Sequence, residues 1–375
     1  MSKFIKDIVK NFSNLPGWRT NRKIVVIESD DWGSIRMPSN EVYDTIMAAG
    51  LSIQNGEGAR YNRYDTLASE ADLTNLFEVL NNVKDKNNHS AKFTAVSLTS
   101  NPDFAKIKQG NFKQYFHEPF TETLKKYNKD SAFSLWKEGR ERNIFVPEFH
   151  GREHLNVATW MRALQSGDKE ALLAFDYDFW SYSRKTGVGF QAAFDLEYNA
   201  DLEVQKNVIT EGLELFEELH GYKARFFVPP NGPFNNQLEK VAAEGGVEFM
   251  SSPKIQKEVL GEGKSTTHFR YLGKENKQGQ KYITRNAFFE PSETSVNEVD
   301  KCLKEIEMAF KWNKPAVISS HRVNYIGGLN EGNRDKSLSQ LKELLETIKK
   351  RWPEVEFMTS SELGDCILKN ELKNA

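Results

Sequence analysis

Short hydrophobic runs, separated by amphipathic stretches, recur along this chain. The runs are rich in β-branched and aromatic residues, and their length suits buried strands. They cover residues 23–28, 92–98, 144–149, 223–228, 247–250, 281–284, 316–320 and 355–358. Between the later runs, apolar residues spaced by three or four positions predict amphipathic helices, at Val299, Leu303, Ile306 and Phe310 and at Leu338, Leu341, Leu345 and Ile348. Pro353 is expected to end the second helix.

Alternation of strand and helix is typical of parallel βαβ units, so we predict an α/β fold with a barrel or a doubly wound sheet. The first half is less regular, and we interpret residues 35–90, 100–145 and 155–205 as long βα insertions. Neither an internal repeat nor a Pro-rich or Ser-rich linker divides the chain, which predicts one domain over residues 1–375. In a barrel the βα loops meet at the carboxyl ends of the strands, where we expect the chemistry.

Charge and cysteine content narrow the class of protein. The chain has 51 basic and 53 acidic residues without long blocks of one sign, so no nucleic-acid partner is predicted. Cys302 and Cys366 lack a C-x-x-C partner, which argues against a disulfide framework and a thiolate zinc site. Lysines interrupt the apolar residues at the N-terminus, so the continuous apolar region of a secretory signal is not predicted there. No stretch approaches the roughly 18 apolar residues of a membrane span. We expect a cytoplasmic, soluble protein, with its oligomeric state left open.

Two adjacent carboxylates, Asp30 and Asp31, end the first predicted strand. Carboxylates that share a site repel each other, and a divalent metal ion would offset that repulsion. One could then ligate the ion while its neighbour accepts a proton from bound water. A turn or a helix N-cap is the simpler interpretation of these residues taken alone.

The third run leads into the sequence H-G-R-E-H, which contains His150 and His154. Histidines four residues apart share one face of a helical turn, so both could reach one ion. This pair follows a strand, as Asp31 does. The remaining histidines before residue 300 have no comparable setting and are interpreted as surface or packing residues: His89, His117, His220 and His268.

Two further strands end in groups that could act on a substrate. His321 follows the run 316–320 and is either a core histidine bonded to backbone or a proton donor to a leaving group. Residues 225–232, R-F-F-V-P-P-N-G, form a strand that enters a rigid turn. The prolines either simply stop the strand or fix a turn that aims a backbone N–H near Asn231 at a developing oxyanion.

In this order, the five segments resemble the polysaccharide deacetylase family, also called the NodB-homology domain or carbohydrate esterase family 4. The resemblance spans most of the chain. The matches to the family's motifs are Asp30-Asp31 with T-F-D-D-G, 150–154 with H-[ST]-x-x-H, 227–232 with R-P-P-Y-G, 318–321 with L-x-x-H and 357–363 with its last strand.

The resemblance implies a distorted (β/α)7-type barrel whose active site lies at the carboxyl rim. It implies one divalent ion, with zinc as our first choice and iron, cobalt or manganese also compatible, held by Asp31, His150 and His154. Asp30 would be the base and His321 would protonate the departing amine. The implied partner is a carbohydrate that carries an acetyl group, which we expect to be N-linked and part of a biosynthetic precursor.

Several residues depart from the family's pattern. Val228 stands where the family has its arginine, so Arg225 or Arg285 could substitute for it. We favour Arg285 because it leaves a strand at the rim, and a surface anchor is the alternative interpretation of this residue. Asn231 stands in place of the family's tyrosine. We assign Asn231 and Trp32 to the substrate side of the site, although aromatic residues more often form core.

Two other functions remain open. H-G-R-E-H has the H-x-x-E-H form of inverted zinc metallopeptidases, in which Glu153 would be the base. That motif needs a helix, and Pro147 and Gly151 argue against one beginning before His150. The second alternative is a barrel that binds a glycan or a metal without catalysis.

Overall fold

The computed structural model describes residues 11–55, 58–184, 187–293 and 297–374. The strands are β1 (Ile24–Trp32), β2 (Phe93–Leu98), β3 (Ser100–Pro102), β4 (His117–Pro119), β5 (Phe145–Gly151), β6 (Phe226–Phe227), β7 (Phe249–Ser251), β8 (Ile255–Gly261), β9 (Lys264–Phe269), β10 (Lys281–Ile283), β11 (Ala287–Phe288), β12 (Ala316–His321) and β13 (Glu356–Met358). All eight predicted runs therefore contain a strand.

The helices lie mainly between these strands. They are α2 (Asn40–Ala48), α3 (Ala59–Tyr64), α4 (Glu70–Asn82), α5 (Phe104–Gln109), α6 (Phe120–Lys126), α7 (Ala132–Glu141), α8 (Val157–Gln165), α9 (Lys169–Phe175), α10 (Asp201–His220), α11 (Leu238–Glu244), α12 (Glu298–Lys311), α13 (Glu331–Arg351) and α14 (Ser360–Asn374), with a 3₁₀ turn, η1 (Arg322–Asn324). The two helices predicted from periodicity are α12 and α13, and α13 ends at Arg351, two residues before Pro353.

The main sheet is parallel and curls into a barrel. Its strand order is β10-β7-β6-β5-β2-β1-β12-β11. The edge strands β10 and β11 belong to one segment, because only residues 284–286 separate them, so the two edges of the sheet meet there. If β10 and β11 are counted together as one strand of the barrel, the barrel has seven strands. This confirms the predicted (β/α)7-type fold. Along one edge of β1, β13 pairs with the first residues and β2 pairs with the residues that follow. β12 pairs along the opposite edge.

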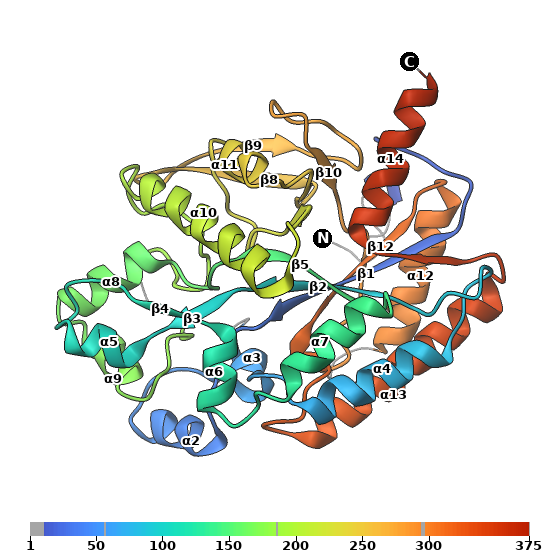
Figure 1. The fold of residues 1–375 in the computed structure, drawn as a ribbon. Coiled ribbons are helices and arrows are strands. Elements are labelled where there is room, and N and C mark those ends of the chain that lie inside the picture. Colours follow the sequence, from blue (N-terminus) through green and yellow to red (C-terminus); the bar gives the residue numbers. More distant parts are fainter. Residues whose placement is uncertain (1–10, 56–57, 185–186, 294–296, 375) are drawn as a thin grey trace.

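Side-chain alternation divides the apolar residues between the inside and the outside of the barrel. Ile24 and Val26 of β1 cluster with Val96, Val317 and other strand residues inside the barrel. The alternate residues Val25 and Ile27 belong to the outer cluster, together with residues of α4, α7, α12 and α13. These four helices lie along the lower right of Figure 1. Beyond Val26 the inward positions of β1 become polar, which marks the carboxyl end of the barrel.

The predicted insertions are long connections between barrel strands. Helices α2 to α4 lie between β1 and β2, while the β3–β4 ribbon and α5 to α7 lie between β2 and β5. Helices α8 to α10 lie between β5 and β6. Several of the short helices gather at the left of Figure 1, and the antiparallel β8–β9 hairpin, which the sequence did not predict, lies at the top. Because β1 pairs with both β12 and β13, we propose that the chain forms one domain.

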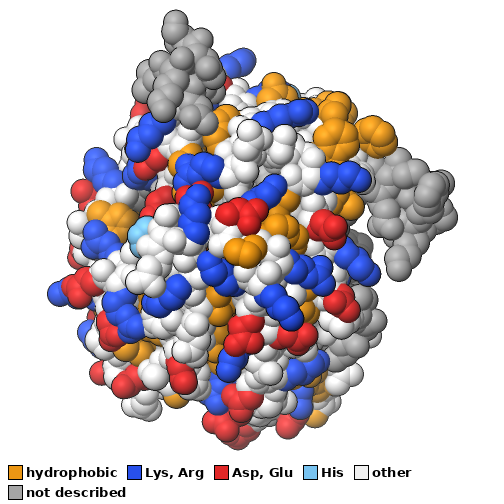
Figure 2. All heavy atoms as spheres, turned by 90° about the vertical axis from the view of Figure 1, so that its right-hand side faces the viewer, with side chains coloured by type: hydrophobic (Ala, Val, Ile, Leu, Met, Phe, Trp, Pro, Cys, Tyr) orange, Lys and Arg blue, Asp and Glu red, His pale blue; other side chains and the backbone are white. Residues whose placement is uncertain are grey.

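The surface agrees with the balanced charge of the sequence. On the face shown in Figure 2, basic and acidic side chains are interspersed. No helix in the described part of the chain is long and apolar enough to cross a membrane.

Candidate active site

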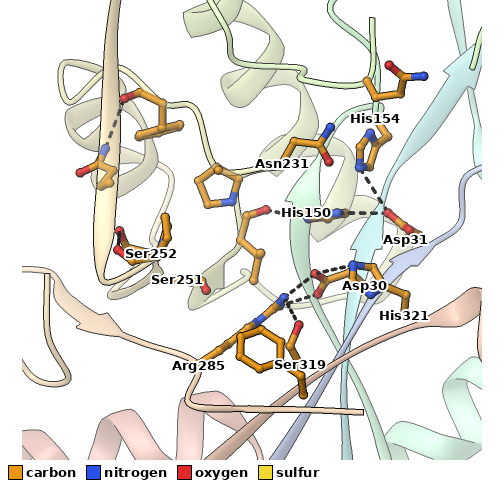
Figure 3. Close-up of a pocket in the computed structure, with 18 of the residues that line it drawn as sticks. Asp30, Asp31, His150, His154, Asn231, Ser251, Ser252, Arg285, Ser319 and His321 are labelled. Carbon is orange, nitrogen blue, oxygen red and sulfur yellow. Dashed lines mark hydrogen bonds and ion pairs between the residues drawn. The ribbon is translucent and has the colours of Figure 1, made fainter. Parts of the chain in front are cut away.

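A cleft of about 1120 Å³ opens at the carboxyl end of the barrel. Seven of the eight predicted site residues line it: Asp30, Asp31, His150, His154, Asn231, Arg285 and His321. They come from β1, β5, β12, the segment between β10 and β11, and the loops that follow β5 and β6. Figure 3 shows the four carboxylate and imidazole groups of Asp30, Asp31, His150 and His154 close together on one wall.

A local irregularity in β1 lets both neighbouring aspartates face the cleft. Strand alternation would send Asp30 and Asp31 to opposite faces of the sheet. The register between β1 and β2 shifts between Ser29 and Trp32, and Asp31 has a left-handed backbone with φ of 76°. Bulges of this kind redirect side chains. Asp31 therefore turns into the site beside Asp30.

Asp31, His150 and His154 form the candidate metal centre. One ligand atom from each side chain lies within 4.8 Å of the others, and all three residues are buried. Oδ1 of Asp31 lies 3.4 Å from Nε2 of His150 and 3.4 Å from Nε2 of His154. In the coordination of a divalent transition metal, each ligand atom lies about 2.0 to 2.2 Å from the ion. A shared ion therefore needs only a small adjustment of the three side chains.

Hydrogen bonding supports a cation at this centre. Nδ1 of His150 lies 2.7 Å from the carbonyl oxygen of Val228, so Nδ1 donates the hydrogen bond and Nε2 keeps its lone pair for a ligand. Both carboxylate oxygens of Asp31 are buried without a hydrogen-bond partner in the described residues. A buried carboxylate without donors is costly unless an ion binds it. The three residues thus fit a divalent cation.

The charge states of the ligands fit as well. Burial, strengthened by the nearby cation of Arg36, lowers the pKa of His154 to about 3, so its imidazole is neutral and can bind a metal. Burial opposes ionisation of Asp31, but Arg36 and the two imidazoles outweigh it and hold the pKa of Asp31 well below its ordinary value. Asp31 is therefore a carboxylate at neutral pH.

The two histidines do not share a helical turn, so that prediction is wrong. His150 lies near the end of β5, and residues 152–154 form an irregular loop after Gly151, which has φ of 128°. Glu153 is not directed at the metal centre: Nε and Nη2 of Arg152 each donate a 2.6 Å hydrogen bond to its carboxylate. This arrangement argues against a metallopeptidase in which Glu153 is the base.

Asp30 is held by a guanidinium. Nη1 and Nη2 of Arg285 donate hydrogen bonds of 2.7 Å and 2.6 Å to the two carboxylate oxygens of Asp30, as Figure 3 shows. Nε of Arg285 donates to Glu28, and Nη1 also donates to Ser319. Although burial opposes ionisation, Arg285 lowers the pKa of Asp30 below its ordinary value. Arg285 thus lies at the position that the sequence analysis favoured, whereas Arg225 pairs with Glu248 and Asp365.

His321 lies on the other side of Asp30. Its Nε2 is 3.8 Å from Oδ2 of Asp30, and its Nδ1 is 2.6 Å from Oε1 of Glu290. Burial disfavours the imidazolium, but Glu290 and Asp30 outweigh it and raise the pKa of His321 above its ordinary value. Despite its burial, Glu290 has a pKa of about 2, because His321 and Arg60 stabilise its charge. His321 is therefore prepared to carry a proton.

The proline turn contributes backbone to the site. The carbonyl oxygen of Val228 accepts the hydrogen bond from His150. The residue that stands in place of the family's arginine therefore orients one of the candidate metal-binding side chains. Asn231 and Gly232 both have positive φ values, 57° and 89°, and line the cleft. A turn of two successive left-handed residues directs backbone groups in a way that an extended strand does not.

The prediction that Trp32 contacts substrate is wrong. Trp32 has no exposed surface, lies in the outer core cluster and packs edge-on against Phe145 at 4.8 Å. Its indole N–H donates to Ser29. The bulge that turns Asp31 into the cleft also returns Trp32 to the core. Trp160, Phe179, Trp180 and Tyr182 are core residues as well.

Sequence reasoning missed four polar residues that complete the site. Glu28 could have been found, because it lies two positions before Asp30 and therefore on the same face of the strand. Glu290, Arg60 and Arg36 come from connections with no periodic signal, and only the fold brings them to the cleft.

No family model matches the sequence, and no curated protein matches it. Among solved structures, the chain is similar to a protein from Mycobacterium smegmatis described as a polysaccharide deacetylase, with 12% identity, 95% of this chain and 94% of that chain covered, and a TM-score of 0.45. A protein from Pseudomonas aeruginosa described in the same way has 10% identity, coverage of 92% and 91%, and a TM-score of 0.43. The 4-alpha-glucanotransferase of Thermococcus litoralis has 13% identity, coverage of 92% and 40%, and the same TM-score.

The family that the sequence motifs resemble thus also appears among the structural neighbours. At these identities and TM-scores the likeness says nothing about chemistry. The function is therefore inferred from the site itself.

Proposed function

We propose that this protein is a metal-dependent hydrolase that removes an acetyl group, most simply an N-acetyl group, from a carbohydrate. The observation that carries the proposal is the buried centre of Asp31, His150 and His154, in which both oxygens of Asp31 lack a hydrogen-bond donor in the part of the chain that the structure describes. Beside this centre lie a carboxylate and an imidazole, each oriented by an oppositely charged partner. This combination suits hydrolysis of an acyl group.

In this proposal the metal centre and Asp30 have different roles in the reaction. A divalent cation held by the three ligands would act as a Lewis acid on the acyl carbonyl and lower the pKa of water. Asp30, oriented by the two hydrogen bonds from Arg285, accepts a proton from the attacking water. Arg285 keeps Asp30 ionised, and therefore able to act as a base, at neutral pH.

His321 supplies the proton that the leaving amine needs. Glu290 fixes the imidazole through Nδ1 and favours its protonated form, so that Nε2 carries the transferable proton toward the cleft. Asn231 lines the cleft, and in this proposal a backbone N–H of its turn donates to the oxyanion. The products are acetate and a free amine on the sugar.

The carbohydrate part of the proposal rests on the ordered set of motifs that resemble the deacetylase family. The size of the cleft is compatible, because about 1120 Å³ lies slightly above the range of about 300 to 1,000 Å³ for small-molecule sites and leaves room for a sugar with a substituent.

Acetate release from a panel of N-acetylated and O-acetylated sugars tests the proposal. The protein is first stripped with a chelator and then reloaded with zinc, cobalt, manganese or ferrous iron. We expect release only from reloaded protein. Silence across the panel, with measurable sugar binding by metal-loaded protein, would instead favour a glycan-binding barrel.

A further inference from the structure

We propose that Arg36 recognises an anionic group, a carboxylate or a phosphate, on the substrate. This inference rests on the proposed function and names the class of sugar that the site takes. Among the described residues, three arginines line the cleft: Arg36, Arg60 and Arg285.

Arg60 and Arg285 are fully engaged by the protein. Arg285 donates to Asp30, Glu28 and Ser319 over distances of 2.6 to 2.9 Å. Arg60 donates through Nη1 to Glu290 and Ser292, each at 2.7 Å, and through Nη2 to the hydroxyl of Tyr61. Both guanidiniums therefore orient other side chains and have little capacity left for a ligand.

Arg36 differs from them. It is only 4% exposed and lines the cleft, yet its one hydrogen bond in the described structure runs from Nη1 to Oγ of Ser181, at 3.3 Å. Its Nε is buried without a hydrogen-bond partner among the described residues. The nearest carboxylates lie beyond good hydrogen-bond distance, with Asp31 at 3.6 Å and Asp65 at 3.5 Å. Buried guanidinium groups are normally hydrogen-bonded, so Arg36 has donors to spare.

Two aromatic rings hold this guanidinium in place. Its carbon lies 4.7 Å from the ring centre of Tyr61 and 5.8 Å from that of Trp180. Stacking of this kind stabilises the cation while leaving the donors at its edge available. Arg36 is therefore pre-organised for a planar, bidentate acceptor.

The charge balance favours an anion as that acceptor. Three neighbouring carboxylates already have cationic partners: Asp30 with Arg285, Glu290 with Arg60 and His321, and Asp65 with Arg322. Asp31 faces both Arg36 and the cation position. A divalent cation bound by Asp31 would leave Arg36 with only the carboxylate of Asp65, 3.5 Å away, to which Arg322 already donates two hydrogen bonds. A negative group on the substrate would restore the balance.

Kinetics on matched substrates test this inference. The probes are one N-acetylated sugar in its neutral form, the same sugar with a carboxylate, and the same sugar with a phosphate. We expect metal-loaded protein to prefer at least one anionic form by about 10-fold or more in kcat/KM, as one charge-assisted pair provides. The two anionic arms show which acceptor the site takes.

Variants of Arg36 locate the effect. Arg36→Gln should lower the ratio of kcat/KM between the preferred anionic sugar and the neutral sugar by about 10-fold, mainly through KM for the anionic form. Arg36→Lys should retain part of that ratio, because the charge remains. Arg63→Gln is the matched control: it removes an exposed guanidinium from α3 that is not among the described residues lining the cleft, and it should leave the ratio unchanged.

The outcomes distinguish a failure of the role of Arg36 from a failure of the proposed deacetylation. Acetate release from none of the probes contradicts the proposed deacetylation. Equal turnover of neutral and anionic sugars, or an unchanged ratio in Arg36→Gln, overturns only the role of Arg36. A fall in kcat that is equal for all sugars would show that Arg36 merely positions Asp31, and it would also overturn the inference.

Discussion

Asp30 and Asp31 are neighbours in the chain but occupy opposite environments. Arg285 donates a hydrogen bond to each oxygen of Asp30, whereas both oxygens of Asp31 are buried without a donor among the described residues, and Oδ1 faces two imidazoles. Arg285 therefore binds Asp30 directly, whereas the nearest guanidinium to Asp31, that of Arg36, lies 3.6 Å away and leaves the oxygens of Asp31 free for an ion. One irregularity in β1 produces this division, because it turns two adjacent carboxylates to the same side.

The largest effect that separates the two aspartates is expected from Asp30→Asn. This change removes the proton acceptor, so kcat should fall by about 10² to 10⁴-fold, while the metal centre keeps its ligands. Steady-state acetate release, with metal content measured on the same sample, checks both parts. If Asp30→Asn keeps more than a tenth of the wild-type kcat, Asp30 is not the base.

A smaller effect is expected from Glu290→Gln. Glu290 raises the pKa of His321, and His321 donates a proton only while it is protonated, so activity falls as the pH rises through that pKa. Loss of the carboxylate lowers the pKa of His321. The alkaline limb of the pH profile should therefore move to lower pH, with about a 10-fold loss of kcat on that limb.

The acid limb, which Asp30 governs, should stay in place in Glu290→Gln. The exposed Glu293 provides the control, because Glu293→Gln removes a carboxylate from the same connection. If the alkaline limb does not move in Glu290→Gln, Glu290 does not raise the pKa of His321.

The smallest effect on catalysis is expected from Glu153→Gln. Arg152 holds this carboxylate away from the metal centre, so kcat/KM should change by less than about 10-fold. Weakening a buried pair should instead lower the free energy of unfolding, by about 1 to 3 kcal/mol. Thermal unfolding measures the loss of stability, and kinetics on the same variant measures any loss of catalysis. Loss of activity comparable to that of Asp30→Asn, in folded protein, would favour the metallopeptidase.

Alternation of strands and helices predicted an α/β fold with a barrel or a doubly wound sheet, and the family resemblance implied the barrel. The candidate site residues were predicted from where strands end. Asp30, Asp31, His150 and His321 each follow a hydrophobic run, and parallel strands share one rim. Trp32 was misplaced because alternation does not reveal a bulge. For the histidine pair, four-residue spacing suggested a helix, whereas the structure uses a strand and a loop.

Residues from long connections could not be predicted. Arg36, Arg60 and Glu290 reach the cleft only through the folding of aperiodic segments, whose tertiary position leaves no local pattern. The identity of the ion and a cytoplasmic location stay predictions.

Metal content tests the central claim most directly. The protein is loaded with zinc, freed of loosely bound ions and analysed by mass spectrometry of its metals, next to Asp30→Asn, Asp31→Asn and His154→Ala. Asparagine tolerates the left-handed backbone of residue 31, so Asp31→Asn removes mainly the charge. We predict about one equivalent in wild type and Asp30→Asn and far less in the other two. Equal metal in wild type and Asp31→Asn, or none in wild type, would contradict a cation centre at these three residues.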